Sequence, residues 1–332
     1  MTTPHDDALS RLVSDAVNDV EPADRLDEIR ARTAETSTSR RRLFIAGGTV
    51  LAAAAAVVAI AMVTVVLNDP APVPSPTDDP TRIVDTPPTA ETVAVPAYYV
   101  GDTGRGLRLF REFVNVEEGP NPVASVLGAL ESTPGDPDYR TLWPAGAFAG
   151  GEVRDDVIHV VIADAALHDR PASMTEAEAA LAIEQVIFSV QGAVGDRLAV
   201  QFRLGVNPVD EVLGQPTSEP LSNADPVDVL SLMSVTYPYE GAVVSGSFVA
   251  EGVNNGHEAT MNWSLVDADG DVVLEGYATA EGWMDALYPW ETDPIDVSGL
   301  AAGTYTFVAV NPDPSGGDGF APDTDTRSIT VE

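Results

Sequence analysis

The chain has 332 residues, no cysteine and a formal net charge of −35, and all 17 of its basic residues are arginine. Without cysteine there is no disulfide, thiolate nucleophile or Cys-based zinc site. So negative a chain is a poor partner for nucleic acid and for anionic envelope polymers, because like charges repel. Cationic partners or high external salt suit it better, and solubility alone is the simpler explanation of the charge.

One uninterrupted apolar run, Leu43–Leu67, divides the chain. It carries no charge over 25 residues, and a bilayer core needs about 20 helical residues. Three arginines at 40–42 precede it, so the positive-inside rule places residues 1–42 in the cytoplasm and the rest outside. A cleaved signal peptide would have a shorter apolar region behind a shorter leader. We therefore expect an uncleaved, single-pass type II anchor in the cell membrane.

The segment before the anchor, residues 1–42, has one apolar stripe at helical spacing. The stripe consists of Leu9, Leu12, Val13, Val17 and Val20. So short a segment can hardly bury a core alone. It either docks on a cytoplasmic partner or on the membrane face, or it is a loosely ordered stub. After the anchor, residues 68–92 are rich in Pro, Thr and Asp, which predicts an extended, semi-rigid linker.

Residues 93–206 mix strand and helix signals, which predicts an α+β domain of one sheet and two helices. Asn121-Pro122 indicates the start of the first helix, since Asn caps and Pro suits the first turn. Ser173 with Glu176 predicts a capping box before the second helix, whose expected buried stripe is Ala180, Ile183, Ile187 and Val190. The expected strands are 93–100, 107–116, 157–162 and 198–206, with a hairpin turn at Asp155-Asp156.

After a connector, 207–232, with a short helix expected at 226–232, the pattern changes to strands alone. The expected strands lie around Val235 and at 243–250, 259–266, 272–278, 295–297, 305–310 and 328–331. About seven short strands in 100 residues predict an immunoglobulin-like β-sandwich over 233–332. Trp263 lies mid-strand, where such sandwiches place a core tryptophan.

Short motifs in residues 93–206 carry a family resemblance. They are Tyr98-Tyr99-Val100, Arg108, Arg111, Phe113, Pro122, Val126-Leu127-Gly128-Ala129-Leu130, Pro134-Gly135-Asp136 and Trp143-Pro144-Ala145-Gly146. With them the segment resembles the GerM-type (GerMN) sporulation and spore-germination domain. It departs from the family at Ile162-Ala163-Asp164-Ala165, where members usually carry a Val-Asp-Leu-Ser-like run.

A closer set of motifs lies in residues 233–332. It comprises Tyr237-Pro238, Gly241, Val243-Val244-Ser245-Gly246, Trp263-Ser264-Leu265-Val266-Asp267-Ala268-Asp269-Gly270 and Gly299-Leu300-Ala301-Ala302-Gly303-Thr304-Tyr305. This part resembles the immunoglobulin-like domain of germination-associated proteins. The two resemblances imply no enzyme activity and no cofactor; they imply envelope-associated assembly, scaffolding or recognition.

Two acidic segments are candidates for a hard cation. Asp267, Asp269 and Asp271 begin like a calcium loop, but Val272 and Ala278 stand where an EF-hand needs Gly and Glu. Asp269-Gly270 between two strands instead favours a hairpin turn. The second segment, 311–325, carries four aspartates, and we expect a solvated loop there. Four scattered histidines predict no metal site.

The sharpest functional signal is an aromatic segment between two expected strands. Trp283, Tyr288 and Trp290 fall within eight residues, and aromatic side chains are enriched at binding hot spots. Proline and nearby acids favour a stiff, partly exposed loop there, although one or more rings could cap the sandwich core instead.

The sequence as a whole predicts a non-enzymatic, membrane-anchored extracytoplasmic protein that binds or scaffolds an envelope protein or wall component. The alternative is a single-pass signalling protein whose ectodomain senses the envelope and whose cytoplasmic helices act on a partner.

Overall fold

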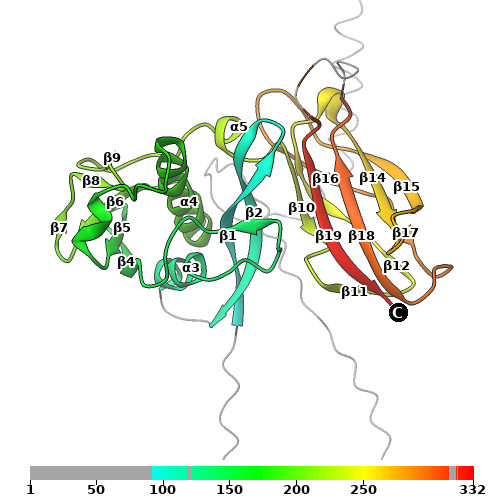
Figure 1. The fold of residues 1–332 in the computed structure, drawn as a ribbon, viewed down its shortest axis with the longest axis horizontal. Coiled ribbons are helices and arrows are strands. Elements are labelled where there is room, and N and C mark those ends of the chain that lie inside the picture. The colour runs from blue at the N-terminus through cyan, green and yellow to red at the C-terminus, as the bar shows by residue number, and fades with distance from the viewer. Residues whose placement is uncertain (1–91, 118–120, 314–318, 320) are drawn as a thin grey trace, which may run out of the picture. The chain divides into compact units, whose positions relative to one another are not determined.

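The structure is a computed structural model, and its described residues all belong to one compact unit of the chain. They are 92–117, 121–313, 319 and 321–332 (Figure 1). The predicted cytoplasmic segment 1–42 and transmembrane helix 43–67 lie outside the described residues, as does the predicted linker except for Thr92. Within the described part, one helix, Glu176–Val194, is long and apolar enough to span a bilayer, and most of it is buried inside the fold as a core helix.

The first part of the described chain contains two sheets and two main helices (Figure 1). The first sheet has the order β2-β1-β3 and consists of β1 (Thr92–Thr103), β2 (Gly106–Glu117) and β3 (Tyr139–Arg140). The second has the order β4-β5-β6-β7 and consists of β4 (Phe148–Arg154), β5 (Val157–Ile162), β6 (Ala199–Leu204) and β7 (Asn207–Pro208). A small hairpin of β8 (Glu211–Val212) and β9 (Gln215–Pro216) follows.

The prediction of a single sheet in this domain was wrong. β1 pairs with β2 along its whole length, from Thr92 opposite Glu117 to Thr103 opposite Gly106, and makes no ladder with β4–β7. α3 (Pro122–Leu130) contacts both β1 and β4 and so separates the two sheets. Parallel strands need a long crossover, and α4 (Glu176–Val194) supplies it between β5 and β6.

Helix α3 begins as predicted, with Asn121 at its N-cap and Pro122 in the first turn. The capping box of α4 was predicted two residues too early. Thr175 and Glu178 form it: the Glu178 carboxylate accepts from Thr175 N at 2.9 Å, and the Thr175 hydroxyl accepts from Glu178 N at 3.2 Å. Of the predicted buried stripe, Ile183, Ile187 and Val190 are buried, whereas Ala180 is exposed. A short helix, α5 (Pro226–Val229), ends earlier than expected.

The second part is the predicted all-β sandwich. Its larger sheet has the order β11-β19-β18-β14-β15, from β11 (Ala242–Val244), β19 (Thr324–Val331), β18 (Gly303–Val310), β14 (Thr260–Val266) and β15 (Val272–Thr279). The facing sheet has the order β10-β13-β16, from β10 (Met233–Tyr237), β13 (Glu251–Asn254) and β16 (Tyr288–Glu291). A small pair joins β12 (Ser247–Phe248) to β17 (Ile295–Asp296). Strands β13 and β16 were not predicted.

The sandwich has its own apolar core, which includes Met261, Leu265 and Phe307. Trp263 is half-buried at the side of this core, and its ring stacks on Phe307 with 6.2 Å between centroids. The predicted turn at Asp269-Gly270 is confirmed, because β14 and β15 pair on either side of it and Gly270 has φ +89°. A smaller apolar cluster around Leu109 and Phe188 of the first domain is joined by Leu230 of the connector and contacts Leu287 of the sandwich.

Candidate functional site

The aromatic segment predicted as a binding loop divides into a core strand and an exposed loop. Trp290 belongs to β16 and is 3% exposed, with its ring in the sandwich core. It lies opposite Gly252. A Cβ on Gly252 would come within 2.6 Å of the indole ring, so the glycine makes room for the tryptophan. The expectation of a loop was therefore wrong from Tyr288 to Glu291, where cross-strand pairing prevails over the proline.

Trp283 and Met284, by contrast, stand out from the sandwich, 38% and 68% exposed. Met284 has a backbone φ of +84°, which is strained for any residue other than glycine. Asn255 holds this conformation: its amide oxygen accepts from Met284 N at 3.1 Å, and its amide nitrogen donates to Met284 O at 3.1 Å and to Ala286 O at 2.8 Å. The loop thus presents two apolar side chains on a braced backbone.

Tyr288 braces the same loop from its other end. Its hydroxyl donates to Asp285 Oδ1 at 2.7 Å, and this hydrogen bond raises the pKa of the tyrosine. Its ring lies against Gly282, where a Cβ would come within 2.6 Å. The three aromatic residues therefore have different surroundings: Trp283 is partly exposed with its ring edge-to-face on His257, Tyr288 supports the loop and Trp290 fills the core. As a binding set they remain a prediction.

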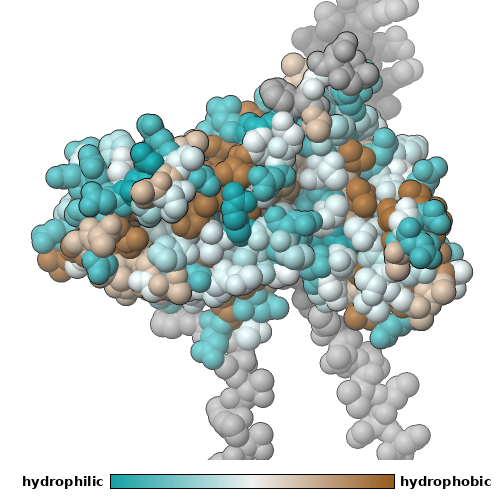
Figure 2. Space-filling view, in the orientation of Figure 1, coloured by the Kyte–Doolittle hydropathy of each residue, from teal (hydrophilic) through white to brown (hydrophobic). Residues whose placement is uncertain are grey.

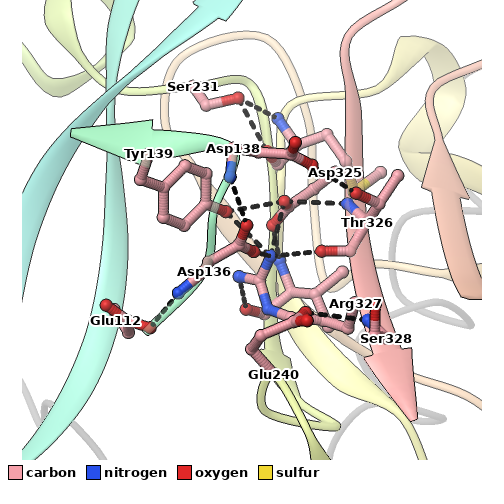
Figure 3. A network of polar contacts seen from close by, with 12 residues as sticks. Glu112, Asp136, Asp138, Tyr139, Ser231, Glu240, Asp325, Thr326, Arg327 and Ser328 are labelled. Atoms are coloured by element: carbon pink, nitrogen blue, oxygen red, sulfur yellow. Dashed lines mark hydrogen bonds and ion pairs between the residues drawn. The ribbon is translucent and has the colours of Figure 1, made fainter. Parts of the chain in front are cut away.

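A buried polar network, which the sequence did not reveal, joins the two domains (Figure 3). Its centre is Arg327 of β19, whose Nη1 donates to Asp136 Oδ2 of the first domain and to Asp325 Oδ1, each at 2.7 Å. The hydroxyl of Tyr139, from β3, donates to Asp325 Oδ1 at 2.6 Å. All three charged side chains are 3% exposed or less.

The same network binds the backbone of the edge strand β10. Asp325 Oδ2 accepts from Val235 N at 2.6 Å, and Arg327 Nη2 donates to Val235 O at 2.8 Å. Asp325 and Arg327 alternate with half-buried positions along β19, on the face that continues as Ile329 and Val331 in the sandwich core. Asp136 and Tyr139 therefore meet inward-facing charges of the sandwich beside β10.

Further contacts run along this junction. Arg105 Nε pairs with Asp323 Oδ2 at 3.1 Å, and Arg111 Nη2 donates to Thr236 Oγ1 at 2.9 Å. The hydroxyl of Thr326 donates to Asp138 Oδ2 at 2.8 Å. The connector is held as well, because Ser231 N donates to Leu109 O at 2.9 Å. The junction is thus built from β2, the 136–140 segment, β10 and β19.

Charge is distributed unevenly between this junction and the surface. Arg327 is the one basic residue among residues 233–332, which contain 17 acidic residues. Its guanidinium is buried in the network, so the sandwich exposes no arginine or lysine within its described part. Hydrophilic and neutral residues cover most of the face in Figure 2, and hydrophobic residues form scattered patches. The sandwich surface is therefore anionic around its exposed apolar loop.

Burial perturbs several pKa values in the network. It raises the pKa of Asp136 to about 6, although the Asp138 amide and Arg327 act in the opposite direction. Burial and the Asp325 carboxylate raise the pKa of Tyr139 far above its usual range. Two neighbouring carboxylates keep Arg327 protonated.

The described residues contain no group of three or more His, Cys, Asp or Glu side chains that could hold a metal ion. Asp267 Oδ1 instead accepts from the amides of Asp269 and Asp271, both at 3.0 Å, and so closes the hairpin turn. His159, in strand β5, is half-buried beside Arg203, and burial lowers its pKa. Part of the acidic segment 311–325 lies outside the described residues.

Comparisons with known proteins agree with the sandwich assignment. Residues 232–318 match the family described as the immunoglobulin-like domain of bacterial spore germination, so the resemblance of this part is confirmed. A comparison with curated proteins finds no match.

Two solved structures are similar in part. The tandem GerMN domains of the sporulation protein GerM from Bacillus subtilis share 16% identity with a TM-score of 0.33, over 63% of this chain and 62% of that chain. CopC from Methylosinus trichosporium OB3b shares 20% identity with a TM-score of 0.21, over 29% of this chain and 86% of that chain.

Proposed function

We propose that this chain is a non-enzymatic, membrane-anchored extracytoplasmic protein that binds a cell-envelope component through the loop 281–287. The observation that carries the proposal is the exposure of Trp283 and Met284 on a backbone fixed by three hydrogen bonds with the Asn255 side chain. An apolar side chain held in a strained backbone conformation is costly to maintain. A preorganised contact surface offsets that cost by binding more tightly, because less conformational freedom is lost on binding.

The kind of partner follows from the charge around the loop. Glu281 and Asp285 lie within it, and the sandwich exposes no arginine or lysine within the described residues. Anionic wall polymers would be repelled by this surface. A protein with an apolar pocket and a basic rim would fit both the two side chains and their acidic border.

The test is retention of the full-length chain, in detergent, on isolated cell envelopes. The double variant Trp283→Ala, Met284→Ala should lose most of the retention with little change in melting temperature, because neither side chain belongs to the sandwich core. Tyr277→Ala is the matched control, since Tyr277 is another exposed aromatic residue, 73% exposed, on strand β15. Full retention of the double variant would refute the loop as the binding site.

A further inference from the structure

The buried network between the domains contains more negative than positive charge. Asp136 and Asp325 share one guanidinium, that of Arg327, and Tyr139 contributes only a neutral hydroxyl. All of these groups are nearly inaccessible to water. Burying an uncompensated carboxylate is unfavourable unless it takes up a proton or pairs with a cation.

The two carboxylates are not equivalent. Asp325 accepts four hydrogen bonds, from Tyr139 Oη, Arg327 Nη1 and the amides of Thr326 and Val235, at 2.6–2.9 Å. Asp136 accepts two, from Arg327 Nη1 at 2.7 Å and Asp138 N at 2.8 Å. Hydrogen bonds to an ionised carboxylate favour the ionised form. Asp325 therefore stays ionised, and the proton that compensates the extra negative charge binds to Asp136.

The other carboxylates around Asp136 also favour a proton there. Glu112 of β2 lies directly beneath the turn, since its carboxylate accepts from Gly135 N at 3.1 Å and from Asp136 N at 3.0 Å. Asp138 follows in the same turn. From β10's side of the network, Glu240 accepts from Ser328 N at 2.8 Å (Figure 3). Arg327 is the cation paired with Asp136, and Arg105, further along the junction, pairs with Asp323.

We propose that Asp136 is a proton-binding site linked to the docking of the two domains: the docked junction takes up one proton from solvent, and separation of the domains releases it. In the separated state the carboxyl is solvated and ionises in its ordinary range. In the docked state the same group is buried against Asp325 and Arg327. Mild acid therefore tightens the junction, and neutral or alkaline pH loosens it.

The size of the effect follows from linkage between protonation and docking. The pKa of Asp136 is about 6 in the docked state against an ordinary value of 3.8. Raising the pKa in the docked state means that this state gains stability as the pH falls from above 6 toward 3.8. At pH 5 the docking equilibrium should exceed its value at pH 7.5 by about tenfold.

Hydrogen exchange on the full-length chain in detergent micelles measures this equilibrium directly. The Ser231 amide donates across the junction to Leu109 O at 2.9 Å, so it is protected while the domains are docked. After correction for the intrinsic rate, the opening constant at the Ser231 amide should fall about tenfold between pH 7.5 and pH 5. An amide in the middle of α4, such as that of Val186, reports any general effect of pH.

Substitution then assigns the proton. Asp136→Asn should abolish the pH dependence, because the amide cannot ionise. Asp155→Asn, at an exposed position in the hairpin between β4 and β5, should keep it. An opening constant that is flat or rises toward acid in the unmodified chain overturns the proposal, and that measurement stands even if Asp136→Asn fails to fold. Full pH dependence in a folded Asp136→Asn chain would equally place the proton elsewhere.

Discussion

Arg327 and Asp136 are 191 positions apart in the chain, yet Arg327 Nη1 and Asp136 Oδ2 lie 2.7 Å apart in a junction where both side chains are buried. The sandwich thus uses its one arginine to pair with a carboxylate of the other domain. Such a pair adds little net stability to the fold. Losing one member is nevertheless costly, because the other is then left as a buried, unpaired charge. Its geometry fixes how β19 and the 136–140 segment meet.

Replacing Arg327 with leucine should lower the free energy of unfolding by about 3–5 kcal/mol, since Asp136 and Asp325 would remain buried without a cation. Denaturant unfolding of the full-length chain measures this. Arg154→Leu is the control: Arg154 is half exposed and pairs with Glu152 at 3.5 Å on the surface, where such pairs contribute about 0–1 kcal/mol. Equal losses for the two variants would mean that the Arg327 network contributes no more than a surface pair.

Trp290→Ala and Trp263→Ala should differ in stability. Trp290 is 3% exposed in the core, so its removal should cost about 3–5 kcal/mol. Trp263 is half-buried and stacks on Phe307, and its truncation should cost less, about 2 kcal/mol by the area it buries. Thermal melts rank the two variants; a larger loss for Trp263 would contradict the packing described for the sandwich.

Gly252→Ala should disrupt the sheet that carries Trp290. A Cβ at this position would lie 2.0 Å from Ser234 O and 2.6 Å from the Trp290 ring, so both the backbone of β10 and the indole would have to move. We expect a loss of at least about 3 kcal/mol, in the range of severe overpacking. At Gly299 an added Cβ meets nothing within 4 Å, so Gly299→Ala should leave the melting temperature nearly unchanged.

Local signals predicted much of the secondary structure. The Asn121-Pro122 helix start, the Asp155-Asp156 hairpin and the strand-only pattern after 233 depend on neighbouring residues, and the structure confirms them. Strand β16 was missed because Pro289 and the nearby acids outweighed its short alternation. Two sheets were mistaken for one, because strand pairing across a helix is not encoded in any single segment.

The junction could not be predicted for the same reason. Asp136 stood in the short motif Pro134-Gly135-Asp136, and Arg327 lay in an ordinary strand pattern. Their pairing depends on the docking of two folded domains. One signal was present nonetheless: a single arginine among 17 acidic residues in 233–332, at an inward-facing strand position. A lone cation in that position calls for a buried anionic partner.

The braced loop gives the last prediction. Asn255→Ala removes the acceptor of Met284 N and the donor to Met284 O and Ala286 O, so the strained Met284 backbone should relax and the loop 281–287 should sample many conformations. Hydrogen exchange of this loop should quicken, while the melting temperature falls only slightly, because the core strands keep their pairing. Envelope retention should weaken, since the loop must then be ordered on binding.

Asn262→Ala, at an exposed position of β14, is the control. A loop that exchanges faster yet retains full binding would show that Trp283 and Met284 act without preorganisation.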